Sequence, residues 1–158
     1  MARAFIGVGS NLGDRESFIA EALRMLNETP GVKVLRSSRT YETEPEGGPA
    51  QGRYLNAVWD IETVLSCPEL LQELLRIEKI LGRKRTVRNA PRTVDLDILF
   101  YENQIHRSAG LTVPHPRLHE RRFVLRPMAD LEPGWVHPEL KKTVQVLLGE
   151  LDERNPEP

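Results

Sequence analysis

The sequence lacks a second cysteine, a long apolar stretch and a surplus of charge of either sign. Its single cysteine, Cys67, cannot form a disulfide within the chain, so we expect a cytoplasmic location. No apolar stretch approaches the roughly 20 residues that span a bilayer. Residues 9–14 contain two glycines and an aspartate where a signal peptide would have its cleavage region, which favours an opening strand and loop. We therefore expect no membrane partner.

The charged residues are balanced overall but unevenly distributed. The chain has 22 basic and 23 acidic residues, so its net charge of −1 offers no global basic surplus for nucleic acid. Five basic residues and no acid lie in Arg83–Arg92, and four arginines with one acid lie in Arg117–Arg126. Two local basic clusters in a neutral protein indicate a small polyanion, such as a nucleotide, rather than a long nucleic acid.

The pattern of apolar residues predicts a regular order of strands and helices in a single domain over residues 1–158. Strands are expected over residues 2–9, 32–43, 54–64 and 93–101, and helices over residues 14–30 and 68–82. The order β-α-β-β-α-β is that of the ferredoxin-like arrangement. We therefore expect an α+β fold in which two helices cover one face of a four-stranded antiparallel sheet.

The last third of the chain has weaker patterns and is expected to form a C-terminal extension with short helices. A short strand is expected at Leu111–Val113, a short helix at Pro116–Arg122 and a last helix at Thr143–Leu151. Residues 152–158 are expected to be a frayed tail.

The strand expected near residue 95 contains two aspartates, in the string PRTVDLDILF. Successive strand side chains point to opposite faces, so Asp95 and Asp97 share one face. Two like charges this close repel each other unless cations neutralise them. Mg²⁺ suits such a pair, because it needs only one or two carboxylates and takes its other ligands from water and phosphates. The alternative is two aspartates on the wet face of a sheet, and the basic loop before them favours the metal.

The opening loop GVGSNLGD is not a nucleotide-binding fingerprint. The pattern G-x-G-x-x-G requires glycine where Leu12 stands, and the loop lacks the Gly-Lys-Ser/Thr ending of a P-loop. Asn11 and Gly13 instead suit the unusual backbone angles of a turn from strand to helix.

His115 and His119 are four residues apart, a spacing that zinc ligands can have on a helix. Pro116 argues against zinc because it disfavours helical geometry at His115. The nearby arginines favour contact of His115 with phosphate, and a capping or surface role is an equally open alternative.

Three other residues could form a slot for a flat heterocycle by ring stacking and paired hydrogen bonds: Tyr54, Asn56 and Phe123. The residues alone favour a core role for the two aromatic rings. Glu78 lies at the edge of its helix's apolar stripe, where it is expected on an amphipathic surface.

Together these residues resemble the 6-hydroxymethyl-7,8-dihydropterin pyrophosphokinase family of folate biosynthesis. The matching pieces run in order over nearly the whole chain: GSNLG at 9–13, YET at 41–43, YLN at 54–56, RIE at 76–78, GR at 82–83, PRTVDLDI at 91–98, TVPH at 112–115, Arg121 and Phe123. The P-R-T-x-D-L-D-I block is very specific, and the V-P-H block supports it.

The resemblance implies a ferredoxin-like fold and transfer of the β,γ-diphosphate of ATP to the pterin's hydroxymethyl group, leaving AMP. It implies two Mg²⁺ ions on Asp95 and Asp97. Catalytic roles fall to Arg83, Arg92, Asp95 and Asp97. ATP binding falls to Glu78, Arg83, Arg85, Arg92, Ile98, Thr112, His115 and Arg121. Pterin binding falls to Thr43, Tyr54, Asn56 and Phe123. Nucleic acid is not an expected partner, and a monomer is expected in preference to a dimer.

Two positions depart from the pattern of some members. Residues 88–90 read Arg-Asn-Ala where those members have a tryptophan that covers the substrates, and Gly110 stands where they have an arginine. The first departure bears on how the loop before Pro91 closes, and the second on one nucleotide contact. Neither affects the aspartates.

Two rival functions are open on the residues alone. One is an ordinary kinase that transfers only the γ-phosphoryl group and yields ADP, and only the resemblance separates it from diphosphate transfer. The other is an RNA-binding ferredoxin-like module, which would carry an RNP1 string on its sheet. No such string occurs in this sequence.

Overall fold

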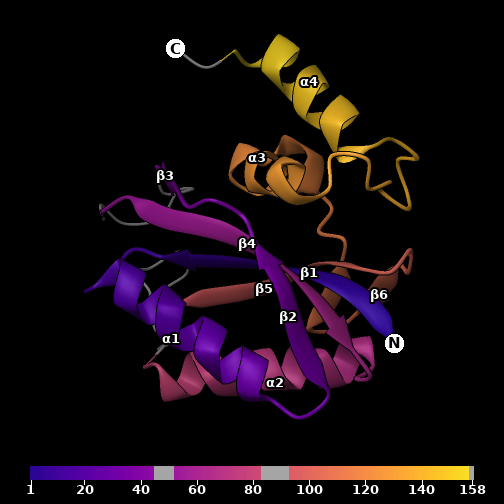
Figure 1. Cartoon of the computed structure of the whole chain (residues 1–158). Helices are drawn as coiled ribbons and strands as arrows, with labels where there is room; N and C mark the ends of the chain where they lie inside the picture. The colour runs from indigo at the N-terminus through magenta and orange to yellow at the C-terminus, as the bar shows by residue number, and fades with distance from the viewer. Residues whose placement is uncertain (45–51, 83–92, 157–158) are drawn as a thin grey trace.

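The computed structural model describes residues 1–44, 52–82 and 93–156 of the chain (Figure 1). Arg83, Arg85 and Arg92, and the tryptophan-less segment 88–90, lie outside the described residues. No helix among the described residues is both long enough and apolar enough to cross a membrane.

Four antiparallel strands form the centre of the molecule in the order β2, β4, β1, β5. Their bounds are β1 (Ala2–Ser10), β2 (Val32–Ser37), β4 (Tyr54–Thr63) and β5 (Asp95–Tyr101). β1 pairs with β4 along its whole length and with β5 on its other side. This confirms the predicted ferredoxin-like sheet, in which the first and third long strands of the chain lie in the middle.

A fifth, short strand, β3 (Tyr41–Thr43), pairs with β4 beyond the end of β2. The sequence predicted one strand over 32–43, and that prediction was wrong at Ser38. There the backbone N–H donates to the Val58 carbonyl and the hydroxyl accepts the Val58 N–H, both at 2.8 Å. The hydroxyl takes a place in the ladder that a backbone carbonyl normally fills, so the strand stops and a new one begins.

Helices α1 (Arg15–Glu28) and α2 (Cys67–Ile80) cover one face of this sheet, as predicted (Figure 1). Asp14 caps α1 by accepting a backbone N–H at 3.1 Å. Ser66 and Glu69 form a capping box at the start of α2, satisfying two N–H groups that the helix itself leaves without partners.

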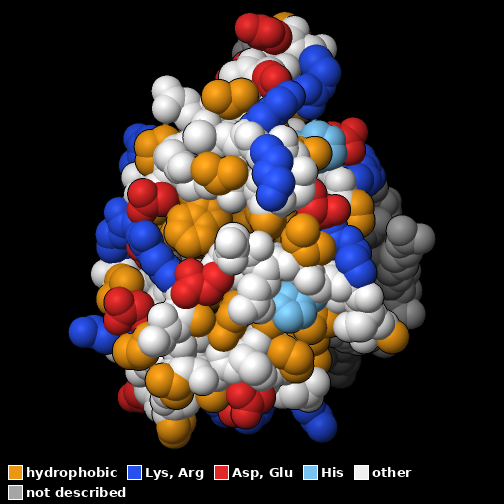
Figure 2. Space-filling view, turned by 90° about the vertical axis from the view of Figure 1, so that its right-hand side faces the viewer, with side chains coloured by type: hydrophobic (Ala, Val, Ile, Leu, Met, Phe, Trp, Pro, Cys, Tyr) orange, Lys and Arg blue, Asp and Glu red, His pale blue; other side chains and the backbone are white. Residues whose placement is uncertain are grey.

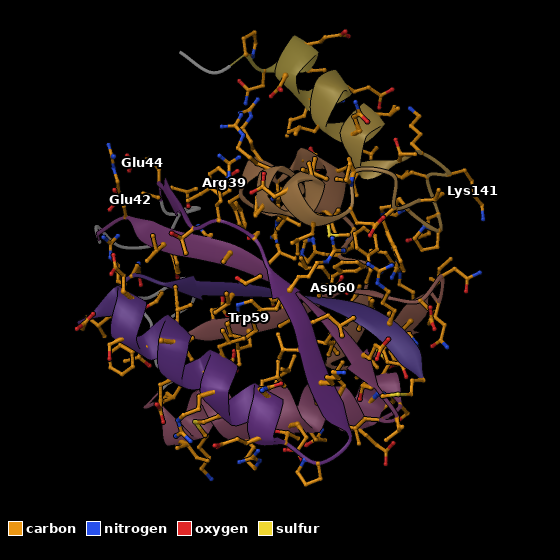
Figure 3. The ribbon with its side chains drawn as sticks, in the orientation of Figure 1. Arg39, Glu42, Glu44, Trp59, Asp60 and Lys141 are labelled. Carbon is orange, nitrogen blue, oxygen red and sulfur yellow. The ribbon has the colours of Figure 1, made fainter. Side chains whose placement is uncertain are left out.

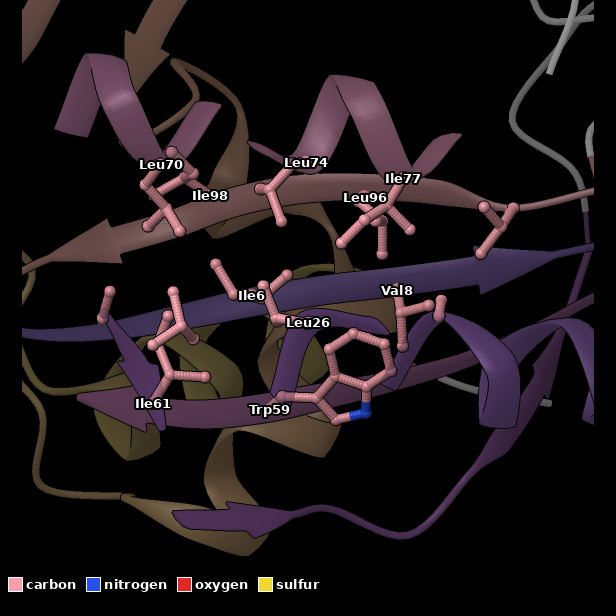
Figure 4. Packing of buried hydrophobic residues seen from close by; sticks show 14 of the residues in the cluster. Ile6, Val8, Leu26, Trp59, Ile61, Leu70, Leu74, Ile77, Leu96 and Ile98 are labelled. Atoms are coloured by element: carbon pink, nitrogen blue, oxygen red, sulfur yellow. The ribbon is translucent and has the colours of Figure 1, made fainter. Parts of the chain in front are cut away.

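The larger hydrophobic cluster lies between these helices and the sheet (Figure 4). Leu70, Leu74 and Ile77 are three or four residues apart, so they share one face of α2 and are all fully buried. They pack with strand residues that include Trp59. Each such side chain contributes roughly 1.5–3 kcal/mol when it leaves water, which makes this layer a rigid support for the strands.

Helices α3 (Arg122–Leu131) and α4 (Val144–Arg154) lie on the opposite face of the sheet (Figure 1). The last helix confirms the prediction at residues 143–151 but continues to Arg154, so the tail expected from residue 152 was wrong at 152–154. α3 was not predicted. The short helix expected at 116–122 is a single 3₁₀ turn, Leu118–Glu120. α3 and α4 pack on a second cluster, against which Trp135 lies with its ring 4.8 Å from that of Phe5.

A small hairpin of β6 (His106–Ser108) and β7 (Leu111–Val113) precedes α3, and β7 confirms the short strand predicted there. Gly110 lies in its turn with φ of 78°. This left-handed conformation favours glycine and would strain an arginine. The departure from the family pattern at this position therefore goes together with the shape of the turn.

β5 contains a bulge that changes which side chains face α3. Phe5 pairs with Phe100 and Ile6 with Ile98, so Leu99 is an extra residue on β5. Leu99 and Phe100 both belong to the cluster under α3 and α4, whereas Ile98 belongs to the cluster under α1 and α2. Because of the bulge, two apolar side chains, Leu99 and Phe100, follow Asp95 and Asp97 on the side of β5 that faces α3.

Candidate active site

A cavity of about 300 Å³ lies between the sheet and the start of α3. Eight residues predicted from the sequence line it: Thr43, Tyr54, Asn56, Asp95, Asp97, His115, Arg121 and Phe123. They come from β3, β4, β5, the segment after β7 and α3. The fold therefore brings the predicted metal carboxylates and all four predicted pterin residues to one cavity.

Asp95 and Asp97 lie on the same face of β5, as the alternation of strand side chains predicted. On the neighbouring strand they are opposite Gly9 and Gly7 respectively. Opposite residues of an antiparallel pair share a face, so the glycines leave open space beside the carboxylates. Two carboxylates facing an open cavity fit Mg²⁺, which takes its remaining ligands from water and phosphate oxygens.

In the described part of the chain, no group of three or more His, Cys, Asp or Glu side chains is arranged to hold a metal ion. His115 Nδ1 accepts the Arg117 backbone N–H at 3.0 Å, which is the capping role left open from the sequence. The same ring also lines the cavity, so capping fixes the orientation in which it faces a ligand.

The predicted pterin residues form two walls of the cavity. Thr43 and Tyr54 are paired across β3 and β4, and the Asn56 amide donates to the Thr43 hydroxyl. Phe123 comes from α3 on the other side and has the Arg121 guanidinium 5.7 Å from its ring centre. Both aromatic rings are half-buried rather than enclosed in the core. Part of each ring therefore remains accessible from the cavity that both residues line.

Gly9 forms part of the floor between these walls. A β-carbon at this position would lie 2.9 Å from Asn56 Oδ1 and 3.2 Å from a ring carbon of Tyr54. Both distances are shorter than ordinary van der Waals contacts. The absence of a side chain at Gly9 therefore sets where the amide and the ring can lie.

A second, smaller cavity of about 130 Å³ adjoins the first, and the two share Asp97, Leu99, His115, Arg121 and Val124. Ile98 and Thr112, both predicted to bind ATP, line this second cavity. Four of the predicted nucleotide residues, Ile98, Thr112, His115 and Arg121, therefore surround one hollow next to the aspartates.

Glu78, another predicted ATP residue, is placed differently. Its side chain is buried, 2% of the residue being exposed, so the expected surface position was wrong. Its carboxylate accepts the Leu96 backbone N–H at 2.7 Å, between the two aspartates in sequence. Glu78 does not line either of these two cavities, and contact with ATP stays a prediction.

Ion pairs hold the described chain on both sides of residues 45–51, at one edge of the larger cavity. Glu44 lines the cavity and contacts Arg53 at 2.9 Å. Arg15 contacts Glu42 at 2.8 Å and donates to the Arg53 carbonyl at 2.9 Å. Glu42 and Glu44 lie near the end of β3 (Figure 3).

Sequence reasoning missed several residues of the larger cavity. Gly7, Glu44, Ala57, Val58, Leu99 and Val124 line it without having been predicted. The one available signal was G-V-G within a strand, since glycines two apart share a face and indicate close approach of a ligand or another chain segment. The others follow from tertiary packing alone.

On the face shown in Figure 2, basic and acidic side chains of the described residues are interspersed. The described part of this face therefore shows no broad basic surface.

Comparisons with known proteins show the family of this chain. The model of the 7,8-dihydro-6-hydroxymethylpterin-pyrophosphokinase (HPPK) family matches residues 5–133. The chain belongs to the HPPK family. A Bacillus subtilis protein named 2-amino-4-hydroxy-6-hydroxymethyldihydropteridine pyrophosphokinase is 44% identical to this chain over 128 residues. The match covers 81% of this chain and 77% of that protein. The Methylorubrum extorquens protein of that name is 41% identical over 152 residues, covering 96% and 95%.

HPPK sequences also occur within longer proteins. The folic acid synthesis protein fol1 of Schizosaccharomyces pombe is 43% identical over 148 residues, and the match covers 94% of this chain but 20% of fol1. A solved HPPK-DHPS structure from Plasmodium falciparum shares the fold, with a TM-score of 0.74 and 16% identity. That match covers 97% of this chain and 42% of the longer one.

Proposed function

We propose that this chain transfers the β,γ-diphosphate of ATP to the hydroxymethyl group of 6-hydroxymethyl-7,8-dihydropterin, with AMP as the second product. The observation that carries the proposal is one cavity lined by Asp95, Asp97 and the four residues expected to bind the pterin. Membership of the HPPK family supports the substrate.

In this proposal the pterin lies between Tyr54 and Phe123, whose half-buried rings come from opposite sides of the cavity. Stacking on aromatic faces suits a flat heterocycle of any polarity, so specificity needs polar groups at its edge. Asn56 and Thr43 provide an amide and a hydroxyl there. Their mutual hydrogen bond fixes both side chains before the ligand binds.

The nucleotide occupies the neighbouring cavity, where Arg121 and His115 contact its phosphates. Asp95 and Asp97 would hold two Mg²⁺ ions, whose charge would supply neutralisation of the phosphate oxygens and a lower pKa of the attacking hydroxyl. The pterin oxygen bonds to the β-phosphorus and its hydroxyl proton passes to water, while the bond from that phosphorus to the oxygen bridging to the α-phosphate breaks and AMP leaves with that oxygen. Arg83 and Arg92, outside the described residues, are proposed to stabilise the departing charge.

The nucleotide product distinguishes this reaction from that of an ordinary kinase. We expect AMP to form when the protein is incubated with ATP, Mg²⁺ and 6-hydroxymethyl-7,8-dihydropterin, and not when the pterin is omitted. Separation of AMP from ADP by chromatography gives the answer. Formation of ADP would identify γ-phosphoryl transfer. The absence of any pterin-dependent nucleotide product would refute the proposal.

Replacing Asp97 with alanine tests the metal site. We expect Asp97→Ala to lower turnover by at least about a thousandfold, because positioning and charge neutralisation supply most of the catalysis in phosphoryl transfer. The far-ultraviolet circular dichroism spectrum should be unchanged. Glu153→Ala removes an exposed carboxylate on α4 and is the matched control, with wild-type turnover. Wild-type turnover in Asp97→Ala would refute the assignment.

A monomeric state and a cytoplasmic location remain predictions from the sequence, and we retain both in the proposal.

A further inference from the structure

Three side chains join β3 to α3 next to the larger cavity. The Tyr41 hydroxyl donates to Asp130 Oδ2 at 2.7 Å. Arg39 Nη2 donates to Asp130 Oδ1 at 3.0 Å and to the Tyr41 hydroxyl at 2.9 Å. The Arg39 guanidinium also lies 5.5 Å from the centre of the Tyr41 ring. We call Arg39, Tyr41 and Asp130 the β3–α3 triad.

The two elements that this triad joins are those that carry opposite walls of the cavity. Tyr41 precedes Thr43 by two residues, so both side chains lie on one face of β3. Tyr41 is also directly opposite Asn56 on β4. Asp130 is seven residues after Phe123, about two turns further along the same helical face. A fixed distance between Tyr41 and Asp130 therefore constrains the distance between the sheet wall and Phe123.

An ordinary surface ion pair would not have this effect, because exposed pairs are mobile and weak. Asp130 differs from such a pair in two respects. The Asp130 side chain is 20% exposed although that of Arg39 is 78% exposed, and the carboxylate accepts from a tyrosine hydroxyl as well as from the guanidinium. Burial raises the pKa of the Asp130 carboxyl, but the hydrogen bonds from Arg39 and Tyr41 outweigh burial and hold the pKa below its ordinary value. The carboxylate is therefore held in its charged form by Tyr41 on β3 and by Arg39, two residues before that strand's start.

The position of Arg39 agrees with a link between β3 and α3. Arg39 lies between β3 and α3, on the side of the sheet that faces α3 (Figure 3). β3 is short and lies at the edge of the sheet, where it pairs only with β4 among the described strands. A three-residue edge strand is easily displaced, so a second attachment, to α3, restricts the movement of β3.

We infer that Asp130 is a positioning residue for the pterin: through Tyr41 and Arg39 it holds the Thr43 wall at the separation from Phe123 that the flat ring requires. The inference rests on the proposed function of the cavity. It assigns Asp130 no contact with substrate. The nucleotide cavity has no residue of β3 or β4 in its lining, whereas Val124 of α3 lines both cavities, so the triad acts on the pterin through the Thr43 wall more than on ATP.

Equilibrium titrations test this. We would measure dissociation constants for 6-hydroxymethyl-7,8-dihydropterin and for α,β-methylene-ATP, which cannot release AMP, in the wild type, Asp130→Asn and Tyr41→Phe. Loss of the charge-assisted bonds in Asp130→Asn should weaken pterin binding by about fivefold to tenfold, and Tyr41→Phe by about threefold. Nucleotide binding should change by less than about twofold in either variant.

The double variant gives a second readout. Because both substitutions break the same Tyr41–Asp130 bond, the combined loss of pterin affinity should be close to that of Asp130→Asn alone and not the product of the two. Glu150 lies on α4 and forms an exposed ion pair with Lys142, so Glu150→Gln is the matched control and should leave the affinity for both ligands unchanged.

The outcomes distinguish the proposed function of the cavity from the positioning role of Asp130. A wild type that does not bind the pterin refutes the proposed function. A wild type that binds it, with equal affinity in Asp130→Asn and Tyr41→Phe, refutes the inference alone. Parallel loss of pterin and nucleotide affinity, with a lower melting temperature, also refutes it, since that would show a general structural role. Tyr41→Phe retains the ring and the Arg39–Asp130 pair, so it provides the test should Asp130→Asn not fold.

Discussion

Gly7 and Gly9 lie directly opposite Asp97 and Asp95 on the adjacent strand, and this pairing gives the candidate site its shape. Any side chain on these two glycines would project into the cavity beside the carboxylates. At Gly7 a β-carbon would lie 3.0 Å from a methyl group of Leu99. The two positions thus work by leaving space, which no list of chemically active side chains reveals.

Substituting Gly9 with alanine should affect one ligand selectively. The new methyl group would lie 2.9 Å from Asn56 Oδ1, so the amide must move. Overpacking of this kind costs about 1–3 kcal/mol, and we expect Gly9→Ala to weaken pterin binding by about tenfold.

Titration of the pterin by fluorescence measures the effect, with α,β-methylene-ATP as the comparison ligand. Gly149→Ala is the control, because Gly149 lies in α4 and a β-carbon there would meet nothing within 4 Å. Unchanged pterin affinity in Gly9→Ala would show that Asn56 does not contact the pterin.

At the level of single residues, the sequence predicted the site where the chemistry was local. Asp95 and Asp97 share a face because strand side chains alternate, and that rule needs no tertiary information. The two aromatic rings could not be decided in the same way. The residues alone favoured a core role for Tyr54 and Phe123, whereas in the fold both rings are half-buried and line the cavity.

Among the elements, α3 is the one whose placement decides the site, and it is attached to the sheet at its C-terminal end by a buried charge. Asp60 is 0% exposed and accepts from Arg3 at 2.8 Å and from Arg36 at 2.7 Å. Both arginines also contact Glu132, directly after α3, and Arg36 donates to the Leu131 carbonyl at 2.9 Å. Figure 3 shows Asp60 between the sheet and α3.

Removing the charge of Asp60 should destabilise the protein. Burial raises the pKa of the Asp60 carboxyl, but hydrogen bonds from Arg3 and Arg36 outweigh it and lower the pKa below its ordinary value. Breaking a buried pair leaves the other charges uncompensated, so Asp60→Asn should lower the free energy of unfolding by about 3 kcal/mol.

Urea denaturation followed by circular dichroism measures this loss. Glu150→Gln, at an exposed ion pair, should lower the same free energy by less than about 1 kcal/mol. Equal stabilities for the two variants would mean that Asp60 does not anchor α3.

The features that the sequence did not predict have two physical causes, a proline within a helix and contacts with a distant strand. α3 contains Pro127, which has no N–H to donate to the carbonyl four residues earlier, so the segment lacks a regular helical signal. The break at Ser38 depends on a side-chain bond to a different strand, and the bulge at Leu99 depends on the register with β1. The helices with strong local caps, at Asp14 and Ser66, were predicted from the sequence.

For the molecule as a whole, stability is expected to depend on pH through a buried histidine. His137 is 3% exposed, and its Nδ1 accepts the backbone N–H groups of Glu139 and Leu140 at 3.2 and 3.1 Å. Burial, assisted by the charges of His119 and Arg107, lowers the pKa of His137 to about 4. The folded protein therefore keeps this ring neutral under conditions in which an unfolded chain would protonate it.

The sign of the effect follows from proton binding. Between about pH 6.5, where an unfolded histidine protonates, and pH 4, the unfolded chain binds more protons than the folded one, so stability falls as the pH falls. The full contribution is present above pH 6.5, and its loss by pH 4 is on the order of 2–3 kcal/mol.

Urea denaturation at pH 7.5 and at pH 4.5 checks this prediction. His137→Asn retains an acceptor near Nδ1 but does not titrate, so its stability should change less between the two pH values. An equal change in wild type and His137→Asn would assign the pH dependence to other groups.

The two hydrophobic clusters lie on opposite sides of one sheet, and each contains or contacts one of the chain's two tryptophans. Trp59 is buried under α1 and α2, and Trp135 packs beside Phe5 on the side of α3. The molecule thus carries an intrinsic optical reporter for each layer. The emission of Trp135 reads out the layer that forms the candidate site, and that of Trp59 the layer that supports it. Because the two emissions overlap, variants that each keep a single tryptophan would report the loosening of one layer by a shift in the emission maximum.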